Sequence, residues 1–263
     1  MYLTDYHTHS QISFDSTASL ADMAQAAAAA GMEELCVTDH CDLLDEDGKP
    51  VRTFDWPAAL EQFRQTLPNC PGGLTLRLGL ELGMAHVDPE AAREILSQPE
   101  LDFVIGSIHN LSPQAGGGDF YYLDHTKASR CYATLDDYFG SMALLSVTDF
   151  YDVLGHIIYP LRYMTAPVTL DRYWEMLDAI LRTVAEQGKG IELNTYTGHT
   201  LRAWRPVLKR YRACGGEIVT LGSDAHAPEG VGRGVREACA LLEEAGFRYT
   251  ATYRRHVPQF HKL

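Results

Sequence analysis

Several features that would indicate a secreted, ribbon-like or membrane protein are missing from this 263-residue sequence. Its six cysteines are scattered and include no Cys-x-x-Cys pair, which argues against a zinc ribbon and against a dense disulfide framework. No apolar run approaches the roughly 18 residues of a membrane-spanning helix, and no basic stretch followed by an apolar one indicates a secretion signal. We therefore expect a cytoplasmic protein with no membrane partner.

Basic residues are scarce relative to acidic ones. The 22 Lys and Arg face 35 Asp and Glu, which gives a formal net charge of −13 at pH 7. A surface of that sign repels the phosphates of nucleic acids and disfavours a general nucleic-acid-binding protein. It does not exclude a small anionic substrate, because bound metal ions can make one cleft positive on an acidic protein. The expected partner is therefore a small molecule, and the sequence leaves the oligomeric state open.

Short β-like runs alternate with amphipathic helical segments along the whole chain, a pattern typical of α/β proteins. Seven such units without a separating linker predict a single domain over 1–263, built as a parallel barrel; an open doubly wound sheet is the alternative. The expected strands are 2–6, 34–38, 74–80, 101–107, 150–155, 190–193 and 217–222. The expected helices are 20–30, 56–67, 89–97, 135–147, 170–187, 201–214 and 231–245, and the long loops are 41–55 and 110–133.

Nearly every expected strand ends in a side chain that can bind a metal ion. The carboxyl ends of barrel strands converge on one rim, where barrel enzymes carry their active sites. Imidazole and carboxylate groups together suit Zn, Mn or Fe. The sequence therefore predicts a metal centre at that rim. Its candidate ligands are His7, His9, Asp15, His40, Glu81, His109, His156, Asp224 and His226.

The motifs around these ligands resemble those of the PHP (polymerase and histidinol phosphatase) family, in order from about residue 3 to residue 245. The stretches 192–195 and 215–226 are most similar to the histidinol-phosphate phosphatase branch. The resemblance implies a distorted (β/α)7 TIM-like barrel with its active site at the C-terminal ends of the strands. The motifs that carry it are His7-Thr8-His9, Thr38-Asp39-His40, Glu81, Ile108-His109, Gly155-His156 and Ser223-Asp224-Ala225-His226.

The resemblance also implies three divalent metal ions, which could be Zn, Mn or Fe. Glu81 would bridge the first and second ions, and Asp15 stands where other members can carry His. The implied ligands are His7, His9, Glu81 and Asp224 for the first ion, Glu81, His109 and His156 for the second, and Asp15, His40 and His226 for the third.

Such a centre predicts metal-assisted hydrolysis of a phosphomonoester. Water shared by two metal ions loses a proton near neutral pH, so the bridging hydroxide would be the nucleophile. Besides Glu81, we assign catalytic roles to Asp224 and His226, which could help to protonate the leaving alkoxide. The resemblance favours L-histidinol phosphate as substrate, which would place the enzyme in histidine biosynthesis.

Arginine forks bind phosphate oxygens in pairs, and Arg162, six residues beyond His156, is the first candidate for that role. Arg202, Arg233 and Asn194 follow, because they lie in or just after loops of the ligand-bearing rim.

Two other functions stay open. The same metal centre could hydrolyse another small phosphomonoester or a nucleotide phosphodiester, or the chain could be a metal-binding module without catalysis. Near Ile158, where the histidinol-phosphate phosphatase branch more often has an acidic residue, this sequence has none. A substrate with an amine needs a carboxylate within reach, and the expected loop 110–133 offers Asp119 and Asp124.

Overall fold

The computed structural model describes all 263 residues, and its strands form a parallel sheet in the order β1-β2-β4-β5-β6-β7-β8. Most residues of these strands are buried, as expected when helices cover the outside of a parallel sheet and side chains fill the inside. The strands are β1 Thr4–Thr8, β2 Glu34–Val37, β3 His40–Asp42, β4 Thr75–Gly83, β5 Phe103–Ser107, β6 Val153–Leu154, β7 Gly190–Asn194, β8 Val219–Gly222, β9 Tyr249–Arg254 and β10 Val257–Lys262.

The sheet curls until its two edge strands, β1 and β8, lie next to each other. The amide of Asp224 donates to the carbonyl of His7, and the amide of His9 donates to the carbonyl of Ala225, both at 2.9 Å. This nearly closed barrel of seven parallel strands confirms the expected TIM-like fold. It also places the chain that follows β8 directly beside the chain that follows β1.

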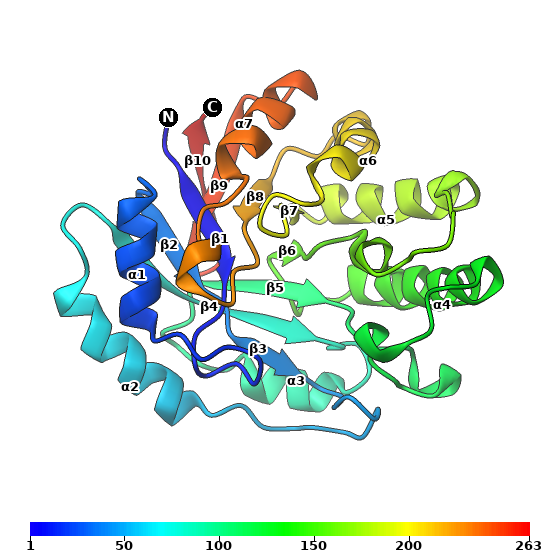
Figure 1. Ribbon diagram of the computed structural model, residues 1–263, viewed down its shortest axis with the longest axis horizontal. Helices are drawn as coiled ribbons and strands as arrows, with labels where there is room; N and C mark the ends of the chain where they lie inside the picture. The colour runs from blue at the N-terminus through cyan, green and yellow to red at the C-terminus, as the bar shows by residue number, and fades with distance from the viewer.

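Seven α-helices surround the barrel and follow one another around it in chain order (Figure 1). The first three begin at a side-chain cap: Ser19, Asp55 and Asp88 accept hydrogen bonds from the amides of Asp22, Ala58 and Ala91. None of the helices combines the length and the apolar character needed to cross a membrane. The helices are α1 Leu20–Ala29, α2 Trp56–Thr66, α3 Pro89–Ile95, α4 Ala128–Ser146, α5 Trp174–Glu186, α6 Leu201–Ala213 and α7 Val235–Glu244.

The expected start of α4 was wrong. We placed it at residue 135 because Thr134 can cap a helix, but the helix begins at Ala128. Cys131 and Thr134 are buried on the same face as Leu135 and Tyr138, so the buried stripe begins about one turn earlier than the cap signal indicates. The loop that begins at residue 110 is shorter for the same reason.

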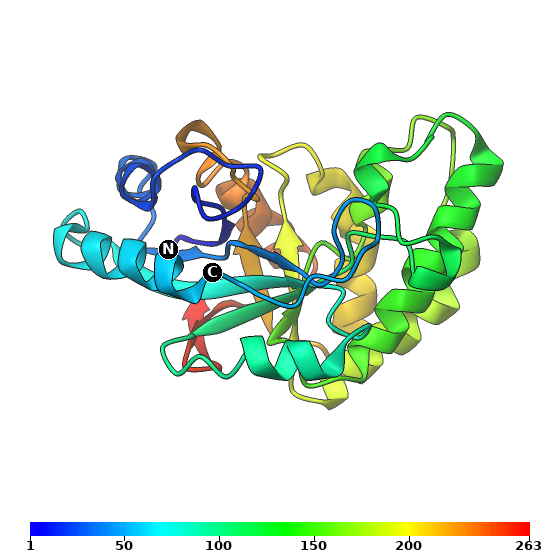
Figure 2. The ribbon, with the colours of Figure 1, turned by 90° about the horizontal axis from the view of Figure 1, so that it is seen from below.

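The C-terminal hairpin of β9 and β10 was not expected from the sequence. It packs Tyr253 against Tyr6 and Phe103, with ring centroids 5.0 Å apart for Tyr253 and Phe103. The amide of His256 donates to the carbonyl of Asp102, which precedes β5, so the hairpin covers the N-terminal end of the barrel. Figure 2 shows it on the side opposite the loops that follow β1, β7 and β8.

The short strand β3 was also missed, and it matters for the site. It pairs with the second half of β4 in a register that places His40 opposite Glu81 and Asp42 opposite Gly83. Part of the expected loop 41–55 is therefore sheet. Adjacent parallel strands bring these side chains to the same end of the barrel.

Candidate metal centre

The nine candidate ligands meet at the C-terminal end of the barrel, as the sequence predicts. Glu81, near the end of β4, is their centre and is fully buried. Its carboxylate oxygens lie 2.8–3.6 Å from a ring nitrogen of each of five histidines. These histidines are His7, His9, His40, His109 and His156.

Asp224 gathers a second group of ligands. Its Oδ1 lies 3.5 Å from Nε2 of His7 and 3.4 Å from Nε2 of His9. One ligand atom from each of these three residues falls within 4.8 Å of the others, and so do atoms of His7, Glu81 and His156. Glu81 and Asp224 therefore face the same two imidazoles, and the placement matches a shared metal centre.

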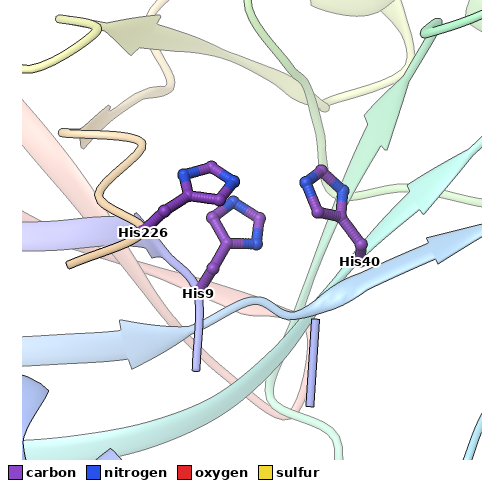
Figure 3. A group of neighbouring side chains, drawn as sticks. All are labelled: His9, His40 and His226. Atoms are coloured by element: carbon purple, nitrogen blue, oxygen red, sulfur yellow. The ribbon is translucent and has the colours of Figure 1, made fainter. Parts of the chain in front are cut away.

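The remaining ligands form the outer part of the cluster. The ring of His9 lies between those of His40 and His226, with centroids 4.2 and 4.1 Å away (Figure 3). Asp15 is more exposed and places Oδ2 3.0 Å from Nε2 of His226 and 3.6 Å from Nε2 of His40. The structure thus brings Asp15, His40 and His226 together, with His9 as a fourth neighbour.

The chemistry of these donors fits divalent metal ions. Nε2 of His7, Nε2 of His9 and Oε2 of Glu81 are buried without a hydrogen-bond partner. Buried polar atoms are costly when unpaired, and three such atoms that converge on one space suit the binding of a cation. Burial favours the neutral form of Glu81, but His7 and His109 hold the pKa of this carboxyl well below its ordinary value. Glu81 is therefore ionised and available as a metal ligand at neutral pH.

Two carboxylates that sequence reasoning did not assign to the site orient its histidines. Oε1 of Glu192 accepts a hydrogen bond from Nδ1 of His7 at 2.7 Å, and Oε2 accepts from the amide of His156 at 2.8 Å. Oδ1 of Asp42 lies 2.7 Å from Nδ1 of His109. The two ring contacts hold the proton on Nδ1 of His7 and His109 and direct Nε2 toward the centre, as carboxylate partners of metal-binding histidines do, whereas the amide contact fixes the backbone of His156. Their positions near the ends of strands were the sequence signal that could have identified Glu192 and Asp42 as part of the site.

The backbone of Asp224 is strained, and a buried carboxylate supports it. Asp224 has a φ of +60°, a left-handed conformation that is unfavourable for most residues. Asp5 is fully buried and accepts hydrogen bonds from the amide and hydroxyl of Ser223 and from the amide of Gly232. It thereby fixes the chain on both sides of Asp224 and His226.

Arg162 lies beside the cluster with its side chain only 5% exposed. Nη1 donates to Oδ2 of Asp224 at 2.8 Å, and Nη2 donates to Oδ1 of Asn194 at 3.2 Å. The rings of Tyr159 and Tyr196 cover the guanidinium at 4.6 and 4.1 Å. Nε is buried and has no partner. Two of the five N–H groups of this guanidinium are thus donated to the protein, which leaves the others for an anion.

The other two candidate arginines lie differently. Arg202, on α6, and Arg233, just before α7, are exposed, and neither side chain makes a hydrogen bond or an ion pair. Their contact with phosphate stays a prediction. Asn194 is buried and links Arg162 to the centre, because its Nδ2 donates to Glu192 and to Asp224.

Comparisons with known proteins agree with this geometry. The probable histidinol-phosphatase of Clostridium acetobutylicum is 28% identical over 254 residues, covering 93% of this chain and 94% of its own. The histidinol-phosphatase of Lactococcus lactis is 26% identical over 258 residues, covering 95% and 93%. The crystal structure of the histidinol phosphate phosphatase from L. lactis, complexed with Zn, L-histidinol and phosphate, matches with a TM-score of 0.84 over 98% of each chain.

A second solved structure shows the same fold. The putative histidinol phosphatase from Listeria monocytogenes matches with a TM-score of 0.73 at 18% identity, over 90% of this chain and all of its own. The sequence profile of the PHP domain matches residues 5–196, well over half of the chain. This chain belongs to the PHP domain family.

Proposed function

We propose that this protein is a metal-dependent phosphomonoesterase that hydrolyses L-histidinol phosphate to L-histidinol and phosphate, a step of histidine biosynthesis. The observation that carries the proposal is the convergence of five imidazoles on the buried Glu81 carboxylate beside Arg162. The likeness to the L. lactis enzyme that binds Zn, L-histidinol and phosphate supports the choice of substrate. The reaction needs both a cationic centre for the phosphate and a pocket for the leaving group.

We assign three metal ions to the nine ligands. When bound, such ions lower the pKa of water and neutralise the charge of phosphoryl oxygens. Glu81 would hold two of the ions, because its two oxygens face different histidines: Oε2 faces His7 and Oε1 faces His156. The assigned ligand sets are His7, His9, Glu81 and Asp224; Glu81, His109 and His156; and Asp15, His40 and His226.

The residues around the metal ligands have separate tasks in this proposal. Arg162 binds a phosphate oxygen through N–H groups that Asp224 and Asn194 leave free, and Asn194 keeps the guanidinium in place. We assign protonation of the leaving alkoxide to Asp224 and His226. Nδ1 of His226 lies 3.0 Å from the carbonyl of Asp224, which fixes the orientation of the imidazole.

Three further assignments belong to the same proposal. Residues 1–263 act as one domain, supported by a hydrophobic cluster that runs from Leu3 to Phe247. The substrate is a small molecule, not a nucleic acid, as the net charge of −13 indicates. The cytoplasmic location of the protein stays a prediction from the sequence.

Phosphate release from the metal-loaded protein tests the proposed substrate. L-Histidinol phosphate should give a kcat/KM of about 10⁴ M⁻¹s⁻¹ or more, the usual order for a natural substrate. A panel of other phosphomonoesters and one nucleotide phosphodiester should react far more slowly. Similar weak rates across the panel would support phosphoesterase activity but exclude a role of this protein in histidine biosynthesis. A preference for the phosphodiester would replace the proposed reaction altogether.

A further inference from the structure

The acidic side chains around the metal centre are almost all engaged in holding other site residues. The assigned ligands Glu81, Asp224 and Asp15 face imidazoles, and Asp224 also pairs with Arg162. The others hold the ligands in place: Glu192 accepts from His7, Asp42 accepts from His109, and Asp39 accepts from Ser10 and Ser13. All of them use both oxygens in such contacts except Asp15, which is assigned to a metal ion and faces His226 and His40 through Oδ2.

Asp119 is different. Its Oδ1 accepts a hydrogen bond from the amide of Tyr121 at 2.7 Å, whereas its Oδ2 takes part in no hydrogen bond and no ion pair. The residue is half-buried, and its backbone pairs with that of Asn110, the residue that follows His109. It therefore stands at the edge of the metal centre with one carboxylate oxygen uncommitted.

The backbone holds Asp119 at that edge. The amide of Phe120 donates to the carbonyl of His109 at 2.9 Å, so the segment of Asp119 is anchored to the chain of a metal ligand. The amide of Asp119 donates to the carbonyl of Glu46 at 3.2 Å. Nearby, Gly48 and Gly117 pack so closely that a Cβ on Gly48 would lie 2.7 Å from Cα of Gly117. A carboxylate placed in advance costs little ordering entropy when it binds a cation.

We propose that Asp119 determines specificity by pairing with the protonated amine of the leaving group. This inference rests on the proposed function, because L-histidinol phosphate carries an amine that is charged at neutral pH. The metal centre and Arg162 attract the phosphate end, so a negative group at the edge suits the cationic end of the same molecule. A partly buried carboxylate has lost water, and an ion pair there is stronger than one in solvent.

Asp124 provides the matched control from the same loop region. Its Oδ1 accepts hydrogen bonds from the amide and the hydroxyl of Thr126, and its Oδ2 pairs with Arg130. Both oxygens are thus committed, and the sequence alone did not separate Asp124 from Asp119. Asp119→Asn and Asp124→Asn remove the same charge and leave the side-chain volume unchanged.

The test compares these two variants on two substrates. One is L-histidinol phosphate, and the other is its deamino analogue, 3-(imidazol-4-yl)propyl phosphate. D119N should lower kcat/KM for L-histidinol phosphate by about 10- to 100-fold, the usual effect of losing a hydrogen bond to a charged group, and leave the analogue within about twofold. D124N should change neither substrate. Metal content and melting temperature, measured on the same samples, should match those of the wild type.

Two results would overturn the assignment of Asp119. Equal losses on both substrates would mean that the residue supports the loop, and no loss on either would mean that the amine binds elsewhere. Phosphoethanolamine and ethyl phosphate separate this inference from the proposed function. If the wild type ignores L-histidinol phosphate but D119N selectively loses hydrolysis of phosphoethanolamine, the substrate is wrong and the role of Asp119 stands.

Discussion

Replacing Glu81 with alanine is expected to lower kcat/KM by at least about 1,000-fold and to leave the protein with less bound metal. The loss of an outer partner of a metal ligand costs roughly 10- to 100-fold, and Glu81 contacts five ligands directly. Without its charge, the imidazoles around it lose the group that holds them together. Phosphate release and metal content per chain, measured on one preparation, check both effects.

A second buried glutamate supplies the control for this variant. Glu34 is 2% exposed and lies at the opposite end of the barrel, where it accepts hydrogen bonds from Tyr6 and Arg77. Glu34→Ala should lower the melting temperature without lowering the metal content of the folded protein. Normal turnover in Glu81→Ala, or equal metal loss in both variants, would contradict the bridging role of Glu81.

Replacing Arg162 with alanine is expected to lower kcat/KM by about 100- to 1,000-fold. That is the usual effect of removing one donor that stabilises charge on a reacting group. The guanidinium is fixed beside the centre by Asp224, Asn194 and two tyrosine rings, so its removal takes away a donor that is already in position. Steady-state kinetics with L-histidinol phosphate measure the loss, and inhibition by inorganic phosphate should weaken in parallel.

Two further variants separate phosphate binding from general damage at Arg162. Arg162→Lys keeps the charge but loses the fork, and it should recover only part of the activity. Arg205, which is exposed on α6 and pairs with Glu244, should tolerate alanine. If Arg162→Ala loses metal rather than affinity for phosphate, the arginine serves mainly to hold Asp224 in place.

The convergence of the candidate metal ligands could be predicted from the sequence because of a simple geometric rule. Parallel strands direct their carboxyl ends to one rim, so His7, Glu81, His109 and Asp224 had to meet once the strands were located. The partners of these ligands could not be predicted in the same way. Whether a carboxylate such as Glu192 faces the Nδ1 of a particular histidine depends on how two distant strands pack.

The hairpin of β9 and β10 was missed for a local reason. Its turn residues are Arg255 and His256, with φ of +49° and +62°, where glycine or asparagine usually signals such a turn. Tertiary contacts replace the missing local preference. The amide of Arg255 donates to Oδ1 of Asp102, and Nδ1 of His256 lies 2.9 Å from Oδ2 of Asp152. A turn that is held by distant residues leaves little signal in its own sequence.

The central claim is that the histidine and carboxylate cluster binds the metal ions on which hydrolysis depends. The most direct measurement follows hydrolysis of L-histidinol phosphate while metal is removed with a chelator and then restored with Zn or Mn, with metal content determined at each step. We predict that activity disappears with the metal and returns in proportion to the ions bound per chain. Full turnover by the metal-free protein would contradict the account.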